Sequence, residues 1–277
     1  MCQHDFDGER LFQHRNTDKW NLFLRNKRVK DFWFEEECRE HVRQLQKLWD
    51  GRMSHYAAAP GRKSAARPRI EMQDSVKIEA CMISCPERAK IRARTLRNLA
   101  ATDWGDLRVR IQLDDGDSED PQDRQTQASY QALRRGIESK ADYLLFLEDD
   151  LEFNRFIRRN LFHWSLLKEG RLTLAGLYNP GLKPVACDVR TNSMVVGANT
   201  IFGSQALLLS LATAKHILRH WKDVQGTQDI RISRLAGQLN GPIFYHVPSL
   251  VQHVGVKSVW GGTFHQARDY DPNWKRP

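Results

Sequence analysis

The chain has 277 residues, of which 40% are hydrophobic and 28% charged, and its formal net charge is +9. These values are typical of a globular protein and exclude a disordered chain, and no apolar run reaches the roughly 18–20 residues of a membrane span. The start, "MCQHDFDGERLF", lacks a basic region followed by an apolar core, so it predicts no secretory signal. Five scattered cysteines favour free thiols over a zinc site. We therefore expect a cytoplasmic protein.

The first 70 residues differ in composition from the rest. Residues 31–49 place apolar side chains at helical spacing behind a possible capping residue, Asp31, and this pattern predicts a helix. Residues 51–70 hold five Arg or Lys and no acid among Ala, Gly and Pro, which is typical of a linker. The sequence thus predicts a helical N-terminal extension with a basic linker over 1–70 and a second domain over 71–277. The basic linker favours a phosphate-bearing partner such as nucleic acid, although a merely solvated linker fits equally well.

Strands and helices alternate from residue 76 onward. The pattern predicts strands over 76–84, 107–116, 141–150 and 171–179, and helices within 85–102, 124–140 and 227–238. A strand, a turn and a helix are expected over 199–221, and a strand pair or extended segment over 242–255. Such alternation is typical of βαβ units and a parallel sheet, whose ligands bind beyond the carboxyl ends of the strands.

Two acidic clusters follow predicted strands directly. Asp114 and Asp115 end one strand, and Glu148, Asp149 and Asp150 end the apolar run "YLLFL". Neither a G-x-G-x-x-G nor a G-x-x-x-x-G-K-[ST] phosphate loop is present in the sequence. Carboxylates do not bind phosphate directly, but they can bind a divalent cation that in turn binds phosphate. A phosphate-bearing ligand at this edge would therefore need a cation.

The motifs "SCPER", "LDDG", "LEDD", "GSQALLLS", "TQD" and "PSLVQHVGVKS", in this order, resemble those of GT-A glycosyltransferases. They are most similar to the N-acetylglucosaminyltransferase IV family, whose members carry "LEDD" and a "PSL-x-QH-x-G" segment followed by Ser. The resemblance covers about residues 76–262. It implies an α/β GT-A fold, Rossmann-like and nucleotide-sugar-binding, with a mixed sheet flanked by helices. The implied enzyme moves a hexosyl or N-acetylhexosaminyl group from a UDP-linked donor to an acceptor hydroxyl, with inversion.

The same resemblance assigns roles to individual residues. Asp150 and His253 would bind Mn²⁺ or Mg²⁺, and Asp229 would be the catalytic base; we expect Asp150 at a solvent-facing rim. Residues expected around the donor are Glu148 and Asp149 at the ribose or at metal-bound water, Pro86 and Arg88 at the base and ribose, Asp114 or Asp115 at the uracil or ribose, Arg124 at the diphosphate, and Gly203, Ser204 and Gln205 beside the sugar. Trp260, Gly261 and Gly262 would form a flexible lid.

Structural alternatives remain for these residues. His253 also fits a strand-edge histidine, Asp229 a carboxylate at a helix N-terminus, and Arg88 and Arg124 a surface role. The acceptor is open among a glycan, glycolipid, small molecule and a hydroxylated base in DNA, which would have to be flipped out of a duplex. Other functions that fit are nucleic-acid binding without catalysis, a metal-dependent nuclease or phosphotransferase, and a GT-A protein that binds its donor without transfer. Manganese-dependent UDP binding would distinguish the glycosyltransferase.

Overall fold

The computed structural model describes residues 3–6, 9–13, 20–24, 27–32 and 76–276, except 183–185, 189–190, 198–202, 240 and 255–264. The chain divides into two compact units, Met1–Ile70 and Glu71–Pro277.

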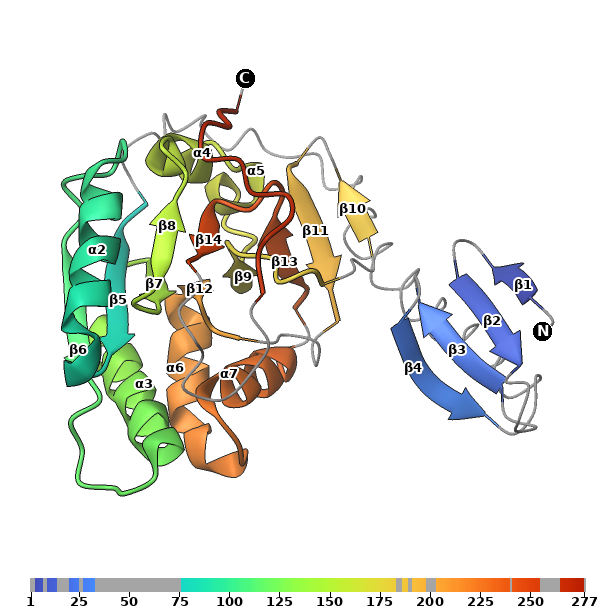
Figure 1. The fold of residues 1–277 in the computed structure, drawn as a ribbon, viewed down its shortest axis with the longest axis horizontal. Helices are drawn as coiled ribbons and strands as arrows, with labels where there is room; N and C mark the ends of the chain where they lie inside the picture. The colour runs from blue at the N-terminus through green and yellow to red at the C-terminus, as the bar shows by residue number, and fades with distance from the viewer. Residues whose placement is uncertain are drawn as a thin grey trace, which may run out of the picture. The chain divides into compact units, whose positions relative to one another are not determined.

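The described part of the first unit is an antiparallel sheet in the order β1-β2-β3-β4 (Figure 1). Its strands are β1 (Gln3–Phe6), β2 (Glu9–Gln13), β3 (Trp20–Leu24) and β4 (Lys27–Phe32). The helical extension predicted for this region is thus wrong over residues 3–32. The missed signal is Asp7-Gly8, the dipeptide typical of two-residue hairpins, between the paired residues Phe6 and Glu9. The predicted helix over 31–49 lies outside the described residues from residue 33 onward.

The second unit is built on an eight-stranded sheet in the order β10-β11-β13-β9-β12-β7-β5-β6. Its strands are β5 (Ile78–Ser84), β6 (Val109–Leu113), β7 (Tyr143–Leu147), β9 (Leu174–Gly176), β10 (Ala186–Asp188), β11 (Ser193–Val196), β12 (Ala206–Ser210) and β13 (Ile243–His246). β5 runs parallel to β6 and β7, whereas β12 runs antiparallel to β7 and β9.

The sheet is therefore mixed, as the GT-A resemblance implies, and not wholly parallel, as the alternation of strands and helices predicts. The hydrophobic pattern does not encode the direction of β12. Its residues Ala206 to Leu209 are all buried, and they pair with the fully buried β7. A strand that is buried on both faces has a continuous apolar sequence, whether it runs parallel or antiparallel to its neighbours.

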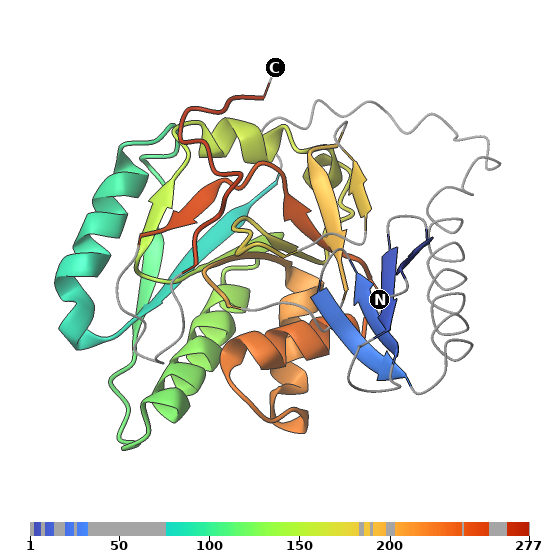
Figure 2. The same cartoon turned by 45° about the vertical axis from the view of Figure 1, so that its right-hand side comes forward.

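Helices cover both faces of this sheet. The helical elements are η1 (Pro86–Arg88), α2 (Ala89–Ala100), α3 (Pro121–Glu138), α4 (Ile157–Phe162), α5 (Ser165–Lys168), α6 (Leu211–Arg219), η2 (Trp221–Asp223) and α7 (Gln228–Gly237). Alternate residues of β5 serve the two cores: Met82 packs with Leu99 of α2 and Leu161 of α4, and Cys81 with Leu133 of α3. In Figure 2, the green α3 and the orange α6 and α7 lie together below the sheet. Among the described residues, no helix has the length and apolar character that a membrane crossing requires.

A small second sheet pairs β8 (Leu151–Phe153) with β14 (Val251–His253) in antiparallel register. β8 begins directly after the acidic triplet, and His253 is the register partner of Leu151. This pairing carries the "QHVG" segment, which is remote in sequence, to the end of β7.

Candidate active site at the end of strand β7

The acidic triplet is held by its backbone. All five residues of β7 are buried, and the chain then leaves the sheet at Glu148. The Glu148 N–H donates to the Gln205 carbonyl at 2.9 Å, and the Asp150 carbonyl accepts from the Val254 N–H at 2.9 Å. The Thr95 hydroxyl of α2 donates to the Asp149 carbonyl at 2.6 Å. Because three separate segments hold this backbone, the three carboxylates are presented in a defined arrangement.

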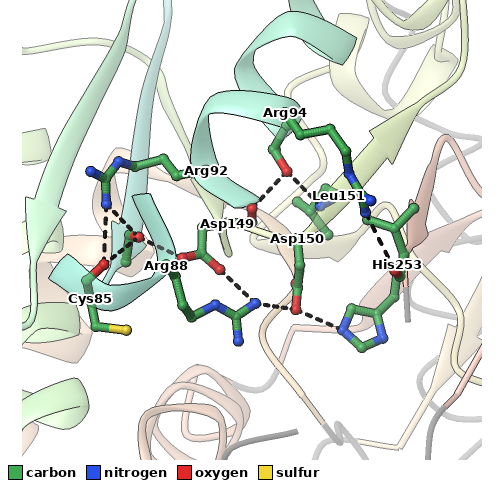
Figure 3. A network of polar contacts seen from close by, with 11 residues as sticks. Cys85, Arg88, Arg92, Arg94, Asp149, Asp150, Leu151 and His253 are labelled. Carbon is green, nitrogen blue, oxygen red and sulfur yellow. Dashed lines mark hydrogen bonds and ion pairs between the residues drawn. The ribbon is translucent and has the colours of Figure 1, made fainter. Parts of the chain in front are cut away.

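Arg88 lies between two of the carboxylates (Figure 3). Its Nη2 is 2.8 Å from Asp149 Oδ1 and 2.5 Å from Asp150 Oδ2. Asp149 Oδ2 also accepts from the Ser84 hydroxyl at 2.5 Å, and Ser84 Oγ accepts in turn from Arg92 at 2.8 Å. Burial lowers the pKa of Arg88, but the two carboxylates outweigh burial and raise it overall. Arg88 therefore contacts the carboxylates of Asp149 and Asp150. The resemblance instead assigns Arg88 to the base and ribose of the nucleotide.

Asp150 is not at a solvent-facing rim. Both Asp149 and Asp150 are only 4% exposed, so the expected rim position is wrong. The reason is tertiary: Arg88 and His253 approach from two different segments and cover Asp150, and neither contact is visible in the local sequence. Charges at such a position are stable only when they are paired.

His253 completes this group from the carboxyl-terminal side. Its Nε2 lies 3.0 Å from Asp150 Oδ2, and the edge of its ring faces Tyr178 with 6.3 Å between centroids. Burial lowers the pKa of His253, but the hydrogen bond and charge of Asp150 raise it overall. Burial raises the pKa of Asp150, but the hydrogen bonds and charges of His253 and Arg88 outweigh burial. The pKa of Asp150 therefore lies below its usual value. The structure thus brings together the two residues predicted as metal ligands.

Glu148 points to a separate set of partners. The Ser204 hydroxyl donates to Glu148 Oε1 at 2.7 Å, and Gln228 Nε2 donates to Ser204 Oγ at 3.2 Å. Burial, together with the negative charge of Asp150, raises the pKa of Glu148 to about 7. The hydrogen bond from Ser204 acts in the opposite direction and lowers it. Glu148 therefore carries a proton part of the time at neutral pH.

Asp229 lies in the first turn of α7, next to Gln228. Its Oδ2 accepts from the Gly203 N–H at 3.1 Å and its Oδ1 accepts from the Thr227 hydroxyl at 2.5 Å. Gly203 has a φ of +85°, and a Cβ there would lie 2.3 Å from Gln205 Oε1. The positive φ therefore favours glycine at this close turn, whereas the flexible end of the Gln205 side chain could move away from a Cβ. The segment 203–205 thus links the Glu148 and Asp229 carboxylates.

The remaining predicted residues lie near the end of β6 or are exposed to solvent. Arg124 Nε donates to Asp114 Oδ1 at 3.1 Å, and Arg124 Nη1 donates to the Ser118 carbonyl at 2.8 Å. The Asp114 N–H donates to the Ser84 carbonyl at 2.7 Å, so this pair adjoins the site through Ser84. Asp115 and Pro86 are exposed, and the predicted lid at 260–262 lies outside the described residues.

Several buried polar atoms of this site have no hydrogen-bond partner. Across the described residues six buried side-chain atoms lack one, and three of them are here: Arg88 Nε, Asp150 Oδ1 and Gln228 Oε1. Buried polar atoms are almost always satisfied by protein, water or ligand. Such a concentration points to a polar ligand at the end of β7.

The protein ligands for a metal ion are few. Within the described ranges, no group of three or more His, Cys, Asp or Glu side chains is arranged to hold one. Asp150, with its unpartnered Oδ1, and His253 offer one carboxylate and one imidazole. This set fits a cation that takes its other ligands from substrate phosphates and water, as Mg²⁺ often does. It does not fit a closed site made of protein ligands alone.

Sequence reasoning missed four residues of this site. They are Ser84, Thr95, Tyr178 and Gln228, which hold or line the carboxylates through the contacts given above. Ser84 and Tyr178 follow the apolar residues of β5 and β9, and a polar residue at a strand's carboxyl end is the signal that would have found them. Thr95 lies within a helix and shows no such signal, whereas Gln228 is the middle residue of the "TQD" motif, in which the resemblance assigns a role to Asp229 alone.

No protein-family model matches the chain, and no curated protein matches it. Solved structures similar to it include A197 from STIV, with a TM-score of 0.43 and 13% identity over 66% of this chain and 87% of that one. Another is TarS from S. aureus, with a TM-score of 0.42 and 13% identity over 66% of this chain and 37% of that one.

Proposed function

We propose that the Glu71–Pro277 unit is a glycosyltransferase that binds a UDP-linked sugar at the end of β7 and transfers the sugar to an acceptor hydroxyl with inversion. The observation that carries the proposal is the set of unpartnered buried atoms around the acidic triplet, Arg88 Nε, Asp150 Oδ1 and Gln228 Oε1. They present donors and acceptors together, which suits a ligand with both phosphate and hydroxyl groups. The "LEDD" and "PSLVQHVG" motifs supply two of the segments that meet there.

Asp150 and His253 would hold the cation, and Mn²⁺ suits a mixed oxygen and imidazole set. When bound, the cation would act as a Lewis acid that balances charge on the departing diphosphate. The Arg88 guanidinium, now between Asp149 and Asp150, adds a fixed positive charge at the same place. The carboxyl of Glu148, whose pKa is about 7, can accept a hydrogen bond from a ribose hydroxyl when it is ionised. When it is protonated, it can donate one to that hydroxyl.

Asp229 would be the general base. It would accept the proton of the acceptor hydroxyl while that oxygen forms its bond to the anomeric carbon and the bond from that carbon to the diphosphate oxygen breaks. The Gly203 N–H and the Thr227 hydroxyl fix the orientation of this carboxylate. The sugar identity follows from the motif likeness alone, which makes N-acetylglucosamine the first sugar to test, with glucose and galactose next.

The first experiment is calorimetric titration of UDP into the protein, once with Mn²⁺ and once with EDTA. Binding that requires Mn²⁺ supports the proposal. The absence of UDP, GDP and CDP binding under both conditions would contradict it. Cleavage of DNA or RNA in the presence of Mn²⁺ would instead indicate a nuclease, and a panel of UDP-sugars follows once UDP binding is established.

A further inference from the structure

The exposed face of helix α2 is uniformly basic. α2 has the sequence AKIRARTLRNLA, which includes four basic residues and no acidic one. Lys90, Arg94 and Arg97 are spaced four and three residues apart and are all exposed, whereas Thr95 and Leu99 on the opposite side are buried. This spacing places the three cations in one row along the helix. None of the three has an ion-pair partner among the described residues.

Three more basic residues lie in α4 or just before it. Asp103, just after α2, accepts from the N–H groups of Arg158 and Arg159 at 2.8 and 2.9 Å, and its own N–H donates to the Arg155 carbonyl. The side chains of Arg155, Arg158 and Arg159 are exposed. We call the set Lys90, Arg94, Arg97, Arg155, Arg158 and Arg159 the basic ridge.

The ridge begins at the candidate active site. Arg94 Nη2 donates to the Val254 carbonyl at 3.4 Å, and the Val254 N–H donates in turn to the Asp150 carbonyl. Figure 3 shows the Arg94 side chain reaching toward His253. A long anionic molecule on the ridge would therefore have one part beside the carboxylates.

Acidic residues near the ridge are few and partly engaged. The Asp103 carboxylate is occupied by the backbone of α4, and Asp106 lies 4.0 Å from Arg158. Glu87 and Glu152 are exposed at the edges of the ridge. Six Arg or Lys side chains stand against these four carboxylates, so the net charge of this face is positive.

We propose that the basic ridge binds nucleic acid and that the acceptor of the transfer is carried on a nucleic-acid strand. The row from Lys90 to Arg97 spans seven residues, or about 10 Å of helix. A duplex strand presents a phosphate about every 3.4 Å along its axis, so the row matches about three phosphates. An anionic membrane is the poorer fit, because membrane-surface helices place apolar residues beside their basic ones. In the described parts of the chain, the exposed large hydrophobic residues are Ile230 and Leu239, which belong to or follow α7.

The acceptor part of this inference rests on the proposed glycosyltransferase function, whereas nucleic-acid binding by the ridge does not. The test therefore measures the two separately. Binding of fluorescein-labelled single-stranded and duplex DNA is followed by fluorescence anisotropy over a series of salt concentrations. Calorimetric titration of UDP with Mn²⁺ is carried out on the same preparations.

The ridge variant is Lys90→Ala/Arg97→Ala/Arg159→Ala, which leaves Arg94 and the carboxylates unchanged. The control variant, Arg134→Ala/Arg135→Ala/Lys215→Ala, removes the same charge from exposed positions on α3 and α6. These helices pack on the other face of the sheet. We expect the ridge variant to lose at least about tenfold in DNA affinity. Three lost single-strand contacts should also reduce the slope of log affinity against log salt by about 2.

The control variant should bind DNA like the unchanged protein, and circular dichroism checks that both variants fold. Equal losses in the two variants would overturn the assignment to the ridge, because they would indicate diffuse attraction to net charge. Binding to phosphatidylserine vesicles without binding to DNA would overturn the nucleic-acid assignment. If the ridge binds DNA but UDP does not bind with Mn²⁺, the acceptor role fails together with the proposed function, while the DNA site stands.

Discussion

His253 and Asp150 are 103 residues apart in the sequence, yet Nε2 of the histidine lies 3.0 Å from Oδ2 of the carboxylate. The antiparallel pairing of β14 with β8 produces this contact, because it places His253 opposite Leu151, the residue after Asp150. The same carboxylate is bound by Arg88 from the end of β5. Asp150 is thus the point at which three distant parts of the chain meet.

Asp150→Asn should abolish manganese-dependent UDP binding. It should also lower the free energy of unfolding by about 1–3 kcal/mol, because Arg88 and His253 lose a buried anionic partner. Calorimetry and urea unfolding measure the two effects, and Asp117→Asn, at an exposed position, is the matched control. UDP binding that survives with Mn²⁺ would remove Asp150 from the metal site.

Asp229→Asn should leave UDP binding intact while transfer falls about 10²–10⁴-fold, the usual contribution of a general base. Transfer is measured on the acceptor found by screening, together with UDP calorimetry on the same variant. Asp223→Asn removes an exposed carboxylate outside the site and serves as the control. Transfer at the unchanged rate would exclude Asp229 as the base.

The contribution of His246 to stability should fall as the pH is lowered from about 7 to about 5. This histidine is fully buried between Trp164 and Trp274, its Nδ1 donates to the Pro248 carbonyl at 2.6 Å, and burial lowers its pKa to about 4. Between pH 6.5 and 4 the unfolded chain binds a proton there that the folded protein does not, so acid favours unfolding. The expected loss from His246 between pH 7 and 5 is about 2 kcal/mol, and Glu148, whose pKa is raised to about 7, contributes in the opposite direction over the same range.

Urea unfolding at several pH values tests this expectation. His246→Phe keeps an aromatic ring without a titrating group, so on acidification from pH 7 to 5 its stability should change by about 2 kcal/mol in the favourable direction relative to that of the unchanged protein. An unaltered pH dependence in His246→Phe would show that other groups cause the acid sensitivity.

Gly176→Ala should destabilise the sheet by about 1–3 kcal/mol through overpacking. Gly176 of β9 is the register partner of Tyr245 of β13, and a Cβ at Gly176 would lie 2.3 Å from the Tyr245 ring. Adding Tyr245→Leu should relieve part of that strain, which a double-mutant cycle in urea measures as a favourable coupling. Gly116→Ala, with its nearest neighbour at 3.6 Å, is the control. Additive effects at 176 and 245 would contradict the packing described here.

The local elements from β5 to β7 could be predicted from the sequence because each carries its own periodic pattern. The helix expected over 124–140 is α3, which begins at Pro121, and the expected strand over 141–150 contains β7. The strands of residues 3–32 carry a hairpin signal at Asp7-Gly8, but helical spacing begins at residue 31 and favours a helical extension. The direction of β12 and the pairing of β8 with β14 carry no local signal and depend on partners remote in sequence.

The sequence by itself determined that the acidic triplet follows a buried strand, because a five-residue apolar run must be buried. The resemblance to GT-A glycosyltransferases predicts roles for Asp150, His253 and Asp229, which stay predictions. Only the tertiary structure decided that Asp150 is buried, that Arg88 neutralises it and Asp149, and that Glu148 turns instead to Ser204. Burial and pairing are properties of the space around a side chain, and segments up to 103 residues away fill that space.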